Sequence, residues 1–252
     1  MSAIVAVPAR LQSTRFPRKV MADLHGKPML WHVLQGVSTA KRIRQVVVLT
    51  DSEEVLEAAR SWGATALMTS PECPSGTARI ASVIGQLDAD IVVNVQADEP
   101  LITGKVVDAV VDSLETSDGD IATPVYRLST EQELADSNVV KVVRAAGGRA
   151  LYFSRNAIPH MRGVKRGEWL KHTTFWGHVG LYAYRRSVLD EYMQLPEGQL
   201  EDIEKLEQLR LLEAGKAILT VEIDNRLHAV DVPSDLEAVK EIMTASASKK
   251  DS

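Results

Sequence analysis

Hydrophobic and polar residues follow two alternating periods along the first half of the chain. Short runs of apolar and β-branched residues are typical of strands buried on both faces. Between them, apolar residues recur every three or four positions, which is typical of helices that bury one face. Strands are expected at residues 3–7, 45–49 and 65–68, and a further strand begins at Ile91. Helices are expected at residues 28–40, 77–86 and 103–114. One more helix is expected to begin at a cap, Asp51 or Ser52, and to end at Gly63.

This alternation predicts βαβ units and therefore a mostly parallel sheet. The fold class that it indicates is α/β, a doubly wound three-layer domain with right-handed crossovers. From about Thr123 the pattern changes to short strands at residues 139–144 and 149–153, joined by a Gly147–Gly148 turn, with a third strand at 177–184.

The remaining segments complete the predicted domain. Residues 159–172 are basic and aperiodic, which predicts a mobile loop. Helices are expected at residues 187–193, 200–214 and 233–244, a strand at 218–223, and a polar, disordered tail at 245–252. We therefore expect one domain over residues 1–244, with a β-rich insertion at about 124–184.

Composition excludes several classes of protein. The chain has 252 residues, 45% hydrophobic and 25% charged, with no apolar stretch of membrane-spanning length. A strand that begins at Ala3 leaves no room for a signal peptide, so a cytoplasmic protein is expected. A single cysteine, Cys73, excludes an internal disulfide framework, and the net charge of -5 argues against nucleic acid as a partner.

The strand that begins at Ile91 carries the strongest chemical signal. It delivers Gln96, Asp98 and Glu99 at its carboxyl end and stops at Pro100. Open α/β sheets place ligands in the crevice at this end of their strands. Adjacent carboxylates there favour a divalent metal, with Asp98 as the better ligand. The alternative is an acidic turn that faces solvent.

A cationic loop follows the first strand. Arg10, Arg15, Arg18 and Lys19 lie in it, and no carboxylate occurs between Pro8 and Ala22. Spaced cations and backbone N–H groups near Ser13 and Thr14 suit a polyphosphate. The loop matches neither the GxxxxGK[ST] nor the GxGxxG pattern. A solvated basic loop is the alternative.

Other candidates have a structural explanation as well as a functional one. Ser75 and Thr77 begin a helix whose amino end favours an anion or a polar ring, but either residue could simply cap that helix. Asp231 is either a helix cap or a second metal ligand opposite Asp98, and Mg²⁺ suits two carboxylates plus phosphates. His178 in a strand is typical of a packed core. Glu201 and Glu204 share one face of the predicted helix and Glu207 is turned well away, and all three are expected to be solvated, with Lys205 and Arg210 nearby.

Several segments together resemble one enzyme family. They are PAR at residues 8–10, STR at 13–15, GKPM at 26–29, MTSP at 68–71, SGTAR at 75–79, NVQADEP at 94–100, NVVKVV at 138–143, ALYFSR at 150–155, GLYAYR at 180–185, IEKLEQLR at 203–210 and VDVPSDL at 230–236. This pattern, from Ile4 to Leu236, resembles the 3-deoxy-manno-octulosonate cytidylyltransferases. The resemblance implies a nucleotide-diphospho-sugar transferase-like fold with a small β-rich dimerisation lobe.

It also implies a cytoplasmic, Mg²⁺-dependent homodimer that joins CTP and 3-deoxy-manno-octulosonate (Kdo) to give CMP-Kdo and pyrophosphate for lipopolysaccharide assembly. Asp98 and Asp231 would bind the metal and, with Arg15 and Lys19, act in catalysis. The residues implied at the nucleotide are Pro8, Arg10, Ser13, Arg15, Lys19, Ser75, Thr77 and Arg79. Those implied at the sugar acid are Gln96, Arg155, His178 and Glu207.

The chain departs from the family pattern at two places. Ala97 stands where a glycine is usual before the metal-binding aspartate, and Arg18-Lys19-Val20 stands where Gly-Lys-Pro is usual. Neither change removes a charged ligand, so activity is expected. Three alternatives stay open: the same reaction on 8-amino-Kdo or a sialic acid, a hexose-1-phosphate nucleotidyltransferase, whose usual glycine-rich loop is absent here, and a non-catalytic nucleotide-binding regulator.

Overall fold

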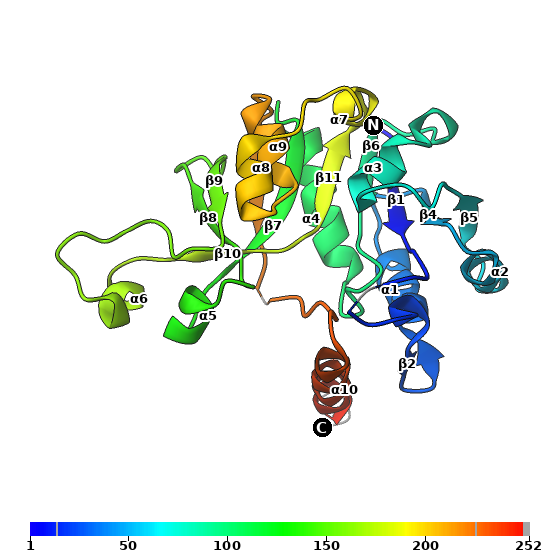
Figure 1. Ribbon diagram of the computed structural model, residues 1–252, viewed down its shortest axis with the longest axis horizontal. Coiled ribbons are helices and arrows are strands. Elements are labelled where there is room, and N and C mark those ends of the chain that lie inside the picture. Colours follow the sequence, from blue (N-terminus) through cyan, green and yellow to red (C-terminus); the bar gives the residue numbers. More distant parts are fainter. Residues whose placement is uncertain (14, 225, 249–252) are drawn as a thin grey trace. The chain divides into compact units, whose positions relative to one another are not determined.

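The computed structural model describes residues 1–13, 15–224 and 226–248 (Figure 1). The chain forms two compact units: unit 1 is Met1–Asp108 with Leu227–Ser252, and unit 2 is Ala109–Arg226. Unit 2 contains the segment predicted as a β-rich insertion, residues 124–184, and extends beyond it on both sides. Among the described helices, none is both long and apolar enough to cross a membrane.

Unit 1 is built on four parallel strands in the order β5-β4-β1-β6 (Figure 1). The strands are β1 (Ala3–Pro8), β4 (Gln45–Thr50), β5 (Thr65–Met68) and β6 (Ile91–Asn94). Every residue of β1 and β6 is buried, as the continuous apolar runs in the sequence predict. The predicted parallel βαβ arrangement is therefore present in this unit.

The other elements of unit 1 follow the predicted order with small differences. They are η1 (Lys19–Met21), the β2–β3 hairpin (Asp23–Leu24 and Lys27–Pro28), α1 (Met29–Ser38), α2 (Glu53–Ser61), α3 (Gly76–Ala81), η2 (Ile84–Gln86) and α10 (Pro233–Ser248), while α4 (Gly104–Glu115) begins in unit 1 and ends in unit 2. The helix expected at residues 77–86 is thus α3 followed by η2. Ser82 Oγ donates to Arg79 O at the end of α3 and competes with helix continuation.

The prediction of a disordered tail from Ala245 is wrong for its first part. Helix α10 continues to Ser248, and residues 249–252 lie outside the described residues. Alanine is a strong helix former, and its propensity offsets the weaker propensity of Thr244 and Ser246, whose hydroxyls donate back to carbonyls four residues earlier. The polar composition of this segment therefore did not prevent a helix.

Unit 2 is organised around β7 (Ile121–Arg127) (Figure 1). Strand β12 (Ile218–Glu222) pairs with it in parallel along one edge, and β10 (Trp176–His178) and β11 (Tyr182–Arg185) pair antiparallel along the other. Strand β8 (Lys141–Arg144) joins β10 to β9 (Ala150–Ser154), which confirms the predicted hairpin. The helices are α5 (Glu131–Ala135), η3 (Arg166–Glu168), α6 (Trp169–His172), α7 (Arg186–Tyr192), α8 (Gln199–Glu204) and α9 (Gln208–Glu213).

The single strand expected at residues 177–184 is wrong, because the structure divides it into β10 and β11. On β7, His178 pairs with Val125 and Ala183 pairs with Ala122, so extra residues lie between the two pairings. Pro124 lies at this point of β7 and has no N–H to donate. The partner chain therefore leaves the ladder opposite the proline and rejoins it at Tyr182.

Two further expectations for unit 2 are also wrong. The helix predicted at residues 200–214 is broken at Lys205, which has a left-handed backbone with φ 51° and separates α8 from α9. The loop predicted at residues 159–172 ends in η3 and α6. Trp169 anchors this segment, because its ring is buried and stacked on Phe175 and its Nε1 donates to Val164 O at 2.9 Å.

Arg18 has a left-handed backbone, with φ 58°. This is the position where the family that the sequence resembles usually has glycine. A side chain costs about 1–2 kcal/mol in this conformation because Cβ approaches the carbonyl oxygen, whereas glycine does not have that penalty. Arg18 pairs with Glu54 through an exposed contact, and such pairs stabilise a protein only slightly.

We predict that Arg18→Gly raises the free energy of unfolding by about 1 kcal/mol relative to Arg18→Ala. Both variants lose the Glu54 ion pair, but only glycine relieves the left-handed strain. Urea denaturation of the two variants measures the difference. Equal stability, or a less stable glycine variant, would contradict the strain at this position.

Candidate active site

The candidate active site lies where two neighbouring parallel strands end. Strands β1 and β6 pair with Ala6 opposite Asn94, so the loops that follow them leave the same edge of the sheet. The loop after β1 carries the predicted cations, and the loop after β6 carries Gln96 and Asp98. Thr14, in the first loop, lies outside the described residues.

Lys19 lies between two aspartates that are far apart in the sequence. Its Nζ is 2.6 Å from Asp98 Oδ2 and 3.2 Å from Asp231 Oδ1. The side chain of Lys19 is 11% exposed, against 24% for Asp98 and 47% for Asp231. Of these three side chains, Lys19 is therefore the least exposed to solvent. Arg15 adds a second cation, 3.2 Å from Asp231 Oδ2. The structure thus brings together all four residues that the sequence predicted to be catalytic.

Asp231 reaches this cluster because the chain returns to unit 1 beside the β6 loop. The Val230 N–H donates to Asp98 O at 2.9 Å, and Val230 is fully buried in a cluster with Leu24 and Met29. The carboxylate of Asp235 accepts from the backbone N–H groups of Asp231 and Val232 at the start of α10. Asp235 therefore serves the helix end, while the Asp231 carboxylate contacts the cations.

Two cavities of about 110 Å³ each adjoin the cluster. One is lined by Pro8, Arg10, Ser13, Lys19, Val20, Gln96, Ala97 and Asp98. The other is lined by Pro8, Arg10, Cys73, Pro74, Ser75, Gly76, Arg79 and Gln96. The shared lining residues place the cavities side by side. The first has cations and a carboxylate in its wall, which suits phosphate oxygens and a metal, and the second has room for a polar ring.

Thr77 and Asn94 hold Gln96 in place through a chain of two hydrogen bonds. Thr77 is fully buried, and its Oγ1 accepts from Asn94 Nδ2 at 3.2 Å. Asn94 Oδ1 in turn accepts from Gln96 Nε2 at 2.9 Å. The structure therefore places Thr77 behind the cavity wall. Sequence reasoning missed Asn94, although an amide within the apolar run from Ile91 was a signal for a buried polar contact.

Ser75 and Gly76 form the turn into α3. Ser75 Oγ accepts from the Ala78 N–H at 3.1 Å, so the capping interpretation of Ser75 is confirmed. A Cβ atom on Gly76 would lie 3.1 Å from both Gln96 Nε2 and Pro8 Cγ. The absence of a side chain at Gly76 therefore keeps this wall of the cavity close to Gln96.

Arg79 is fixed by a buried ion pair that the sequence did not predict. Its side chain is 3% exposed, its Nη2 lies 3.0 Å from Asp51 Oδ2, and its Nη1 donates to Thr69 Oγ1. Asp51 also accepts from the Leu11 N–H at 3.4 Å. Asp51, expected only as a possible helix cap, thus links the cationic loop to the wall of the second cavity.

Ala97 fits its position without backbone strain. Among the described residues, the non-glycine positions with positive φ are Arg18, His25 and Lys205, so Ala97 does not need the freedom of glycine. Ala97 is buried and lines the cavity that holds Asp98 and Lys19. Of the two departures from the family pattern, the strained one is therefore Arg18.

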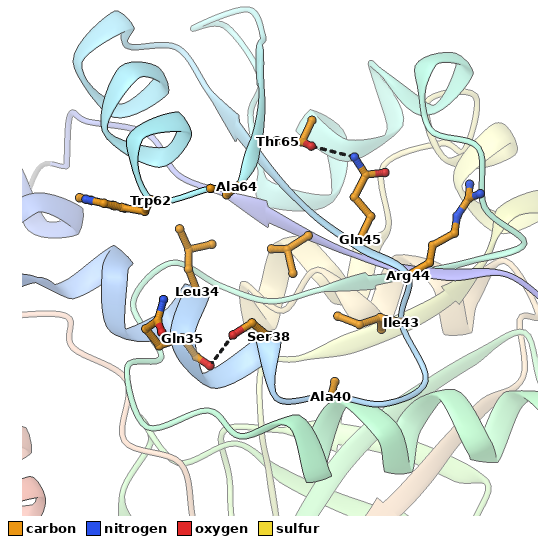
Figure 2. A pocket seen from close by; sticks show the side chains of 12 residues that line it. Leu34, Gln35, Ser38, Ala40, Ile43, Arg44, Gln45, Trp62, Ala64 and Thr65 are labelled. Atoms are coloured by element: carbon orange, nitrogen blue, oxygen red, sulfur yellow. Dashed lines mark hydrogen bonds between the residues drawn. The ribbon is translucent and has the colours of Figure 1, made fainter.

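A larger cavity, of about 360 Å³, opens at the opposite, amino ends of β4 and β5 (Figure 2). Leu34, Trp62 and Ile43 form its apolar wall, and Gln45 Nε2 donates to Thr65 Oγ1 across it. Its charged lining residue, Arg44, pairs with Asp88 at 2.9 Å. Eight of the predicted site residues line the cavities at the other end of the strands instead: Pro8, Arg10, Ser13, Lys19, Ser75, Arg79, Gln96 and Asp98.

In unit 2, Arg155 is held by its surroundings. Its Nε donates to Glu204 O at 2.8 Å and its Nη1 to Ser137 O at 3.0 Å, while its backbone N–H donates to Glu204 Oε2. Arg155 O accepts from Lys141 Nζ, which is fully buried. Burial lowers the pKa of Lys141, and two further carbonyls partner its ammonium group.

The expectation of a solvated face for the three glutamates is wrong. Glu204 accepts from Ser154 Oγ at 2.6 Å, and Glu207 accepts from Tyr192 Oη at 2.6 Å. Glu201 pairs with Arg210 at 2.6 Å, and the Arg210 guanidinium lies over the Tyr192 ring. The break at Lys205 turns these side chains to separate partners, which an uninterrupted helix pattern could not predict.

His178 lies at the end of β10 among aromatic rings. Its ring meets Phe153 edge-on at 4.9 Å and lies 5.4 Å from Tyr182. Burial lowers the pKa of His178 to about 3, so the imidazole is neutral at physiological pH. Its Nε2 is 2.9 Å from Thr123 Oγ1. Of the residues implied at the sugar acid, Gln96 belongs to unit 1, and Arg155, His178 and Glu207 belong to unit 2.

Comparisons with known proteins show the family of this chain. The Cytidylyltransferase family model matches residues 4–218. The 3-deoxy-manno-octulosonate cytidylyltransferase of Acidobacterium capsulatum is 42% identical, over 96% of this chain and 97% of its own length. The enzyme of the same name from Chlorobium limicola is 41% identical, over 99% of this chain and 100% of its own length.

Solved structures give the same result. A CMP:2-keto-3-deoxy-manno-octonic acid synthetase complexed with CTP superposes with a TM-score of 0.91 at 38% identity, covering 98% of this chain and 100% of that one. A cytidylyltransferase from Leptospira borgpetersenii, with a TM-score of 0.63 and 18% identity, shares the fold. The sequence and the fold together show that this chain is a nucleotidyltransferase and belongs to the 3-deoxy-manno-octulosonate cytidylyltransferase family.

Proposed function

We propose that this protein transfers the cytidylyl group of CTP to Kdo, giving CMP-Kdo and pyrophosphate for lipopolysaccharide assembly. The observation that carries the proposal is the contact of Lys19 with both Asp98 and Asp231 beside two adjacent cavities. The names of the relatives and the CTP in the similar solved structure support this choice of substrates.

The donor set of the site fits Mg²⁺. Asp98 and Asp231 supply two carboxylates that both reach one cationic atom, so they lie close enough to share an ion. Among the described residues there is no cluster of three or more potential metal ligands, and Mg²⁺ commonly takes one or two carboxylates and completes its shell with phosphate oxygens and water. When bound, the ion would offset charge on the phosphates and lower the pKa of the attacking hydroxyl.

The chain's own cations have a defined task in this reaction. The 2-hydroxyl oxygen of Kdo loses its proton to solvent and forms a bond to the α-phosphorus of CTP, the bond from that phosphorus to the bridging oxygen breaks, and pyrophosphate leaves. Arg10, Arg15 and Lys19 border the cavity or its carboxylates and supply positive charge where the leaving group gains negative charge. Lys19 would exchange its aspartate contacts for phosphate oxygens.

The second cavity supplies the surroundings of the nucleoside. Pro8, Ser75 and Gly76 offer backbone and hydroxyl groups, and the buried Asp51–Arg79 pair keeps the wall rigid. Thr77 would act through Asn94 and Gln96 rather than by contact. Arg155 would hold the sugar carboxylate, as the resemblance implies.

We also propose that the protein is a cytoplasmic homodimer. The resemblance to the family supports the homodimer, and three large apolar side chains of unit 2 are exposed and available to an interface. They are Leu151 on β9, Ile203 on α8 and Met193 after α7. A second copy of the chain is the partner that would cover them.

The direct test of the function is pyrophosphate release from purified protein with each nucleoside triphosphate, with and without Mg²⁺. We expect release with CTP and Kdo in the presence of Mg²⁺, and rates at least tenfold lower with ATP, GTP or UTP. A sialic acid or 8-amino-Kdo preferred over Kdo would support the alternative substrates. Tight CTP binding in calorimetry without any turnover would indicate a nucleotide-binding regulator instead.

We predict that Asp98→Ala lowers kcat by about 10²-fold or more, because the site loses several kcal/mol of charge stabilisation. The matched control is Glu53→Ala, which removes an exposed carboxylate at the start of α2, away from the cavities, and should be near neutral. Coupled pyrophosphate assays measure both variants. Full turnover by the Asp98 variant would show that this aspartate is not part of the catalytic machinery.

A further inference from the structure

Phe16 is an aromatic residue of the cationic loop and lies between Arg15 and Lys19 in the sequence. Its side chain is partly buried and packs against a set of buried apolar residues, the α10 cluster, which consists of Leu24, Met29, Val230, Leu236 and Val239. Burial of apolar surface stabilises such a contact. The loop that carries the cations is therefore anchored in unit 1 by an apolar side chain.

The α10 cluster also holds the two segments that supply the carboxylates. Val230 belongs to the cluster and directly precedes Asp231, and Leu101, in the loop of Asp98, packs against it. The ion pair between Arg15 and Asp231 is exposed, and exposed pairs stabilise a protein only slightly. The apolar contacts are therefore the stronger means of holding these three segments together.

A tight turn connects Phe16 to Lys19. The Lys19 N–H donates to Phe16 O at 3.2 Å and closes this turn. Pro17 at its second position and the positive φ of Arg18 at its third are typical of a type II turn. The ring of proline fixes φ, so the turn has few alternative conformations. The place of Phe16 on the α10 cluster therefore determines where Lys19 lies.

We propose that Phe16 is a positioning residue, whose contact with the α10 cluster holds Arg15 and Lys19 facing Asp231 and the phosphates of the nucleotide. A loop that is already held in its binding conformation loses little conformational entropy when a polyphosphate binds, whereas a loose loop loses more. This inference rests on the proposed function for the identity of the nucleotide. The contacts that carry it lie within unit 1.

The test is calorimetric titration of the full chain, in the presence of Mg²⁺, with two probes. Inorganic tripolyphosphate carries the phosphates that the cationic loop would bind, and CMP carries the nucleoside without the β- and γ-phosphates. We expect Phe16→Ala to weaken tripolyphosphate binding about tenfold and to change CMP binding by less than about twofold. Phe16→Leu keeps an apolar side chain on the cluster and should restore tripolyphosphate binding to within about threefold of the wild type.

Met243→Ala is the matched control. Met243 lies on α10 and packs against the same cluster, but it is not part of the cationic loop. We expect this variant to change neither affinity, because the Phe16–Lys19 turn stays anchored. In the pyrophosphate assay, Phe16→Ala should raise the KM for CTP about tenfold, and Met243→Ala should leave it unchanged.

Wild-type affinity for tripolyphosphate in Phe16→Ala would overturn the positioning role. The same holds for an equal loss of affinity in Met243→Ala, for an equal loss of CMP binding, and for a Phe16→Leu variant that binds as weakly as Phe16→Ala. An unchanged KM for CTP in Phe16→Ala would overturn its part in the reaction. If the wild type releases no pyrophosphate with CTP and Kdo, the proposed function fails, while the titrations still decide the role of Phe16.

Discussion

The ammonium group of Lys19 is within contact distance of two carboxylates, and the candidate active site is arranged around that contact. Two aspartates that share a small volume repel each other, and a cation between them offsets the repulsion. Lys19 Nζ does this at 2.6 Å from Asp98 and 3.2 Å from Asp231. A bound divalent ion would offset the same repulsion more strongly. The same two carboxylates would therefore pair with Lys19 in the free protein and with the ion when it is bound.

Three separate parts of the chain must meet for this contact to form. The parallel pairing of β1 and β6 brings the cationic loop and Asp98 to one edge of the sheet. The Val230–Asp98 backbone bond and the burial of Val230 bring Asp231 to the same place. The positive φ of Arg18, directly before Lys19, turns the loop into η1. The strained backbone of Arg18 is therefore part of the turn that places Lys19 between the two aspartates.

Much of unit 1 could be predicted from the sequence, because its signals are local. Continuous apolar runs predict buried parallel strands, and the carboxyl ends of such strands meet at one edge. That rule was enough to place Asp98 beside the cationic loop. The position of Asp231 stayed open between a helix cap and a ligand, because the choice depends on how a distant segment returns to the sheet.

The errors in unit 2 have a different origin. The division of the strand at residues 177–184 follows from Pro124 on the neighbouring strand, and the break at Lys205 accompanies backbone carbonyls that accept from Arg155. Both depend on partners that are distant in sequence, so the hydrophobic pattern of a short segment could not predict either break. The same holds for Asp51 and Asn94, whose importance depends on the side chains that they meet.

The most direct measurement of the central claim is calorimetric titration of Mg²⁺ into the nucleotide-free protein and its Lys19→Met variant, with Arg18→Met as the control. If Lys19 neutralises the two aspartates, its removal should strengthen Mg²⁺ binding about tenfold, a change of about 1.4 kcal/mol, while Arg18→Met leaves it unchanged. Equal or weaker binding by the Lys19 variant would contradict a shared carboxylate site for lysine and metal.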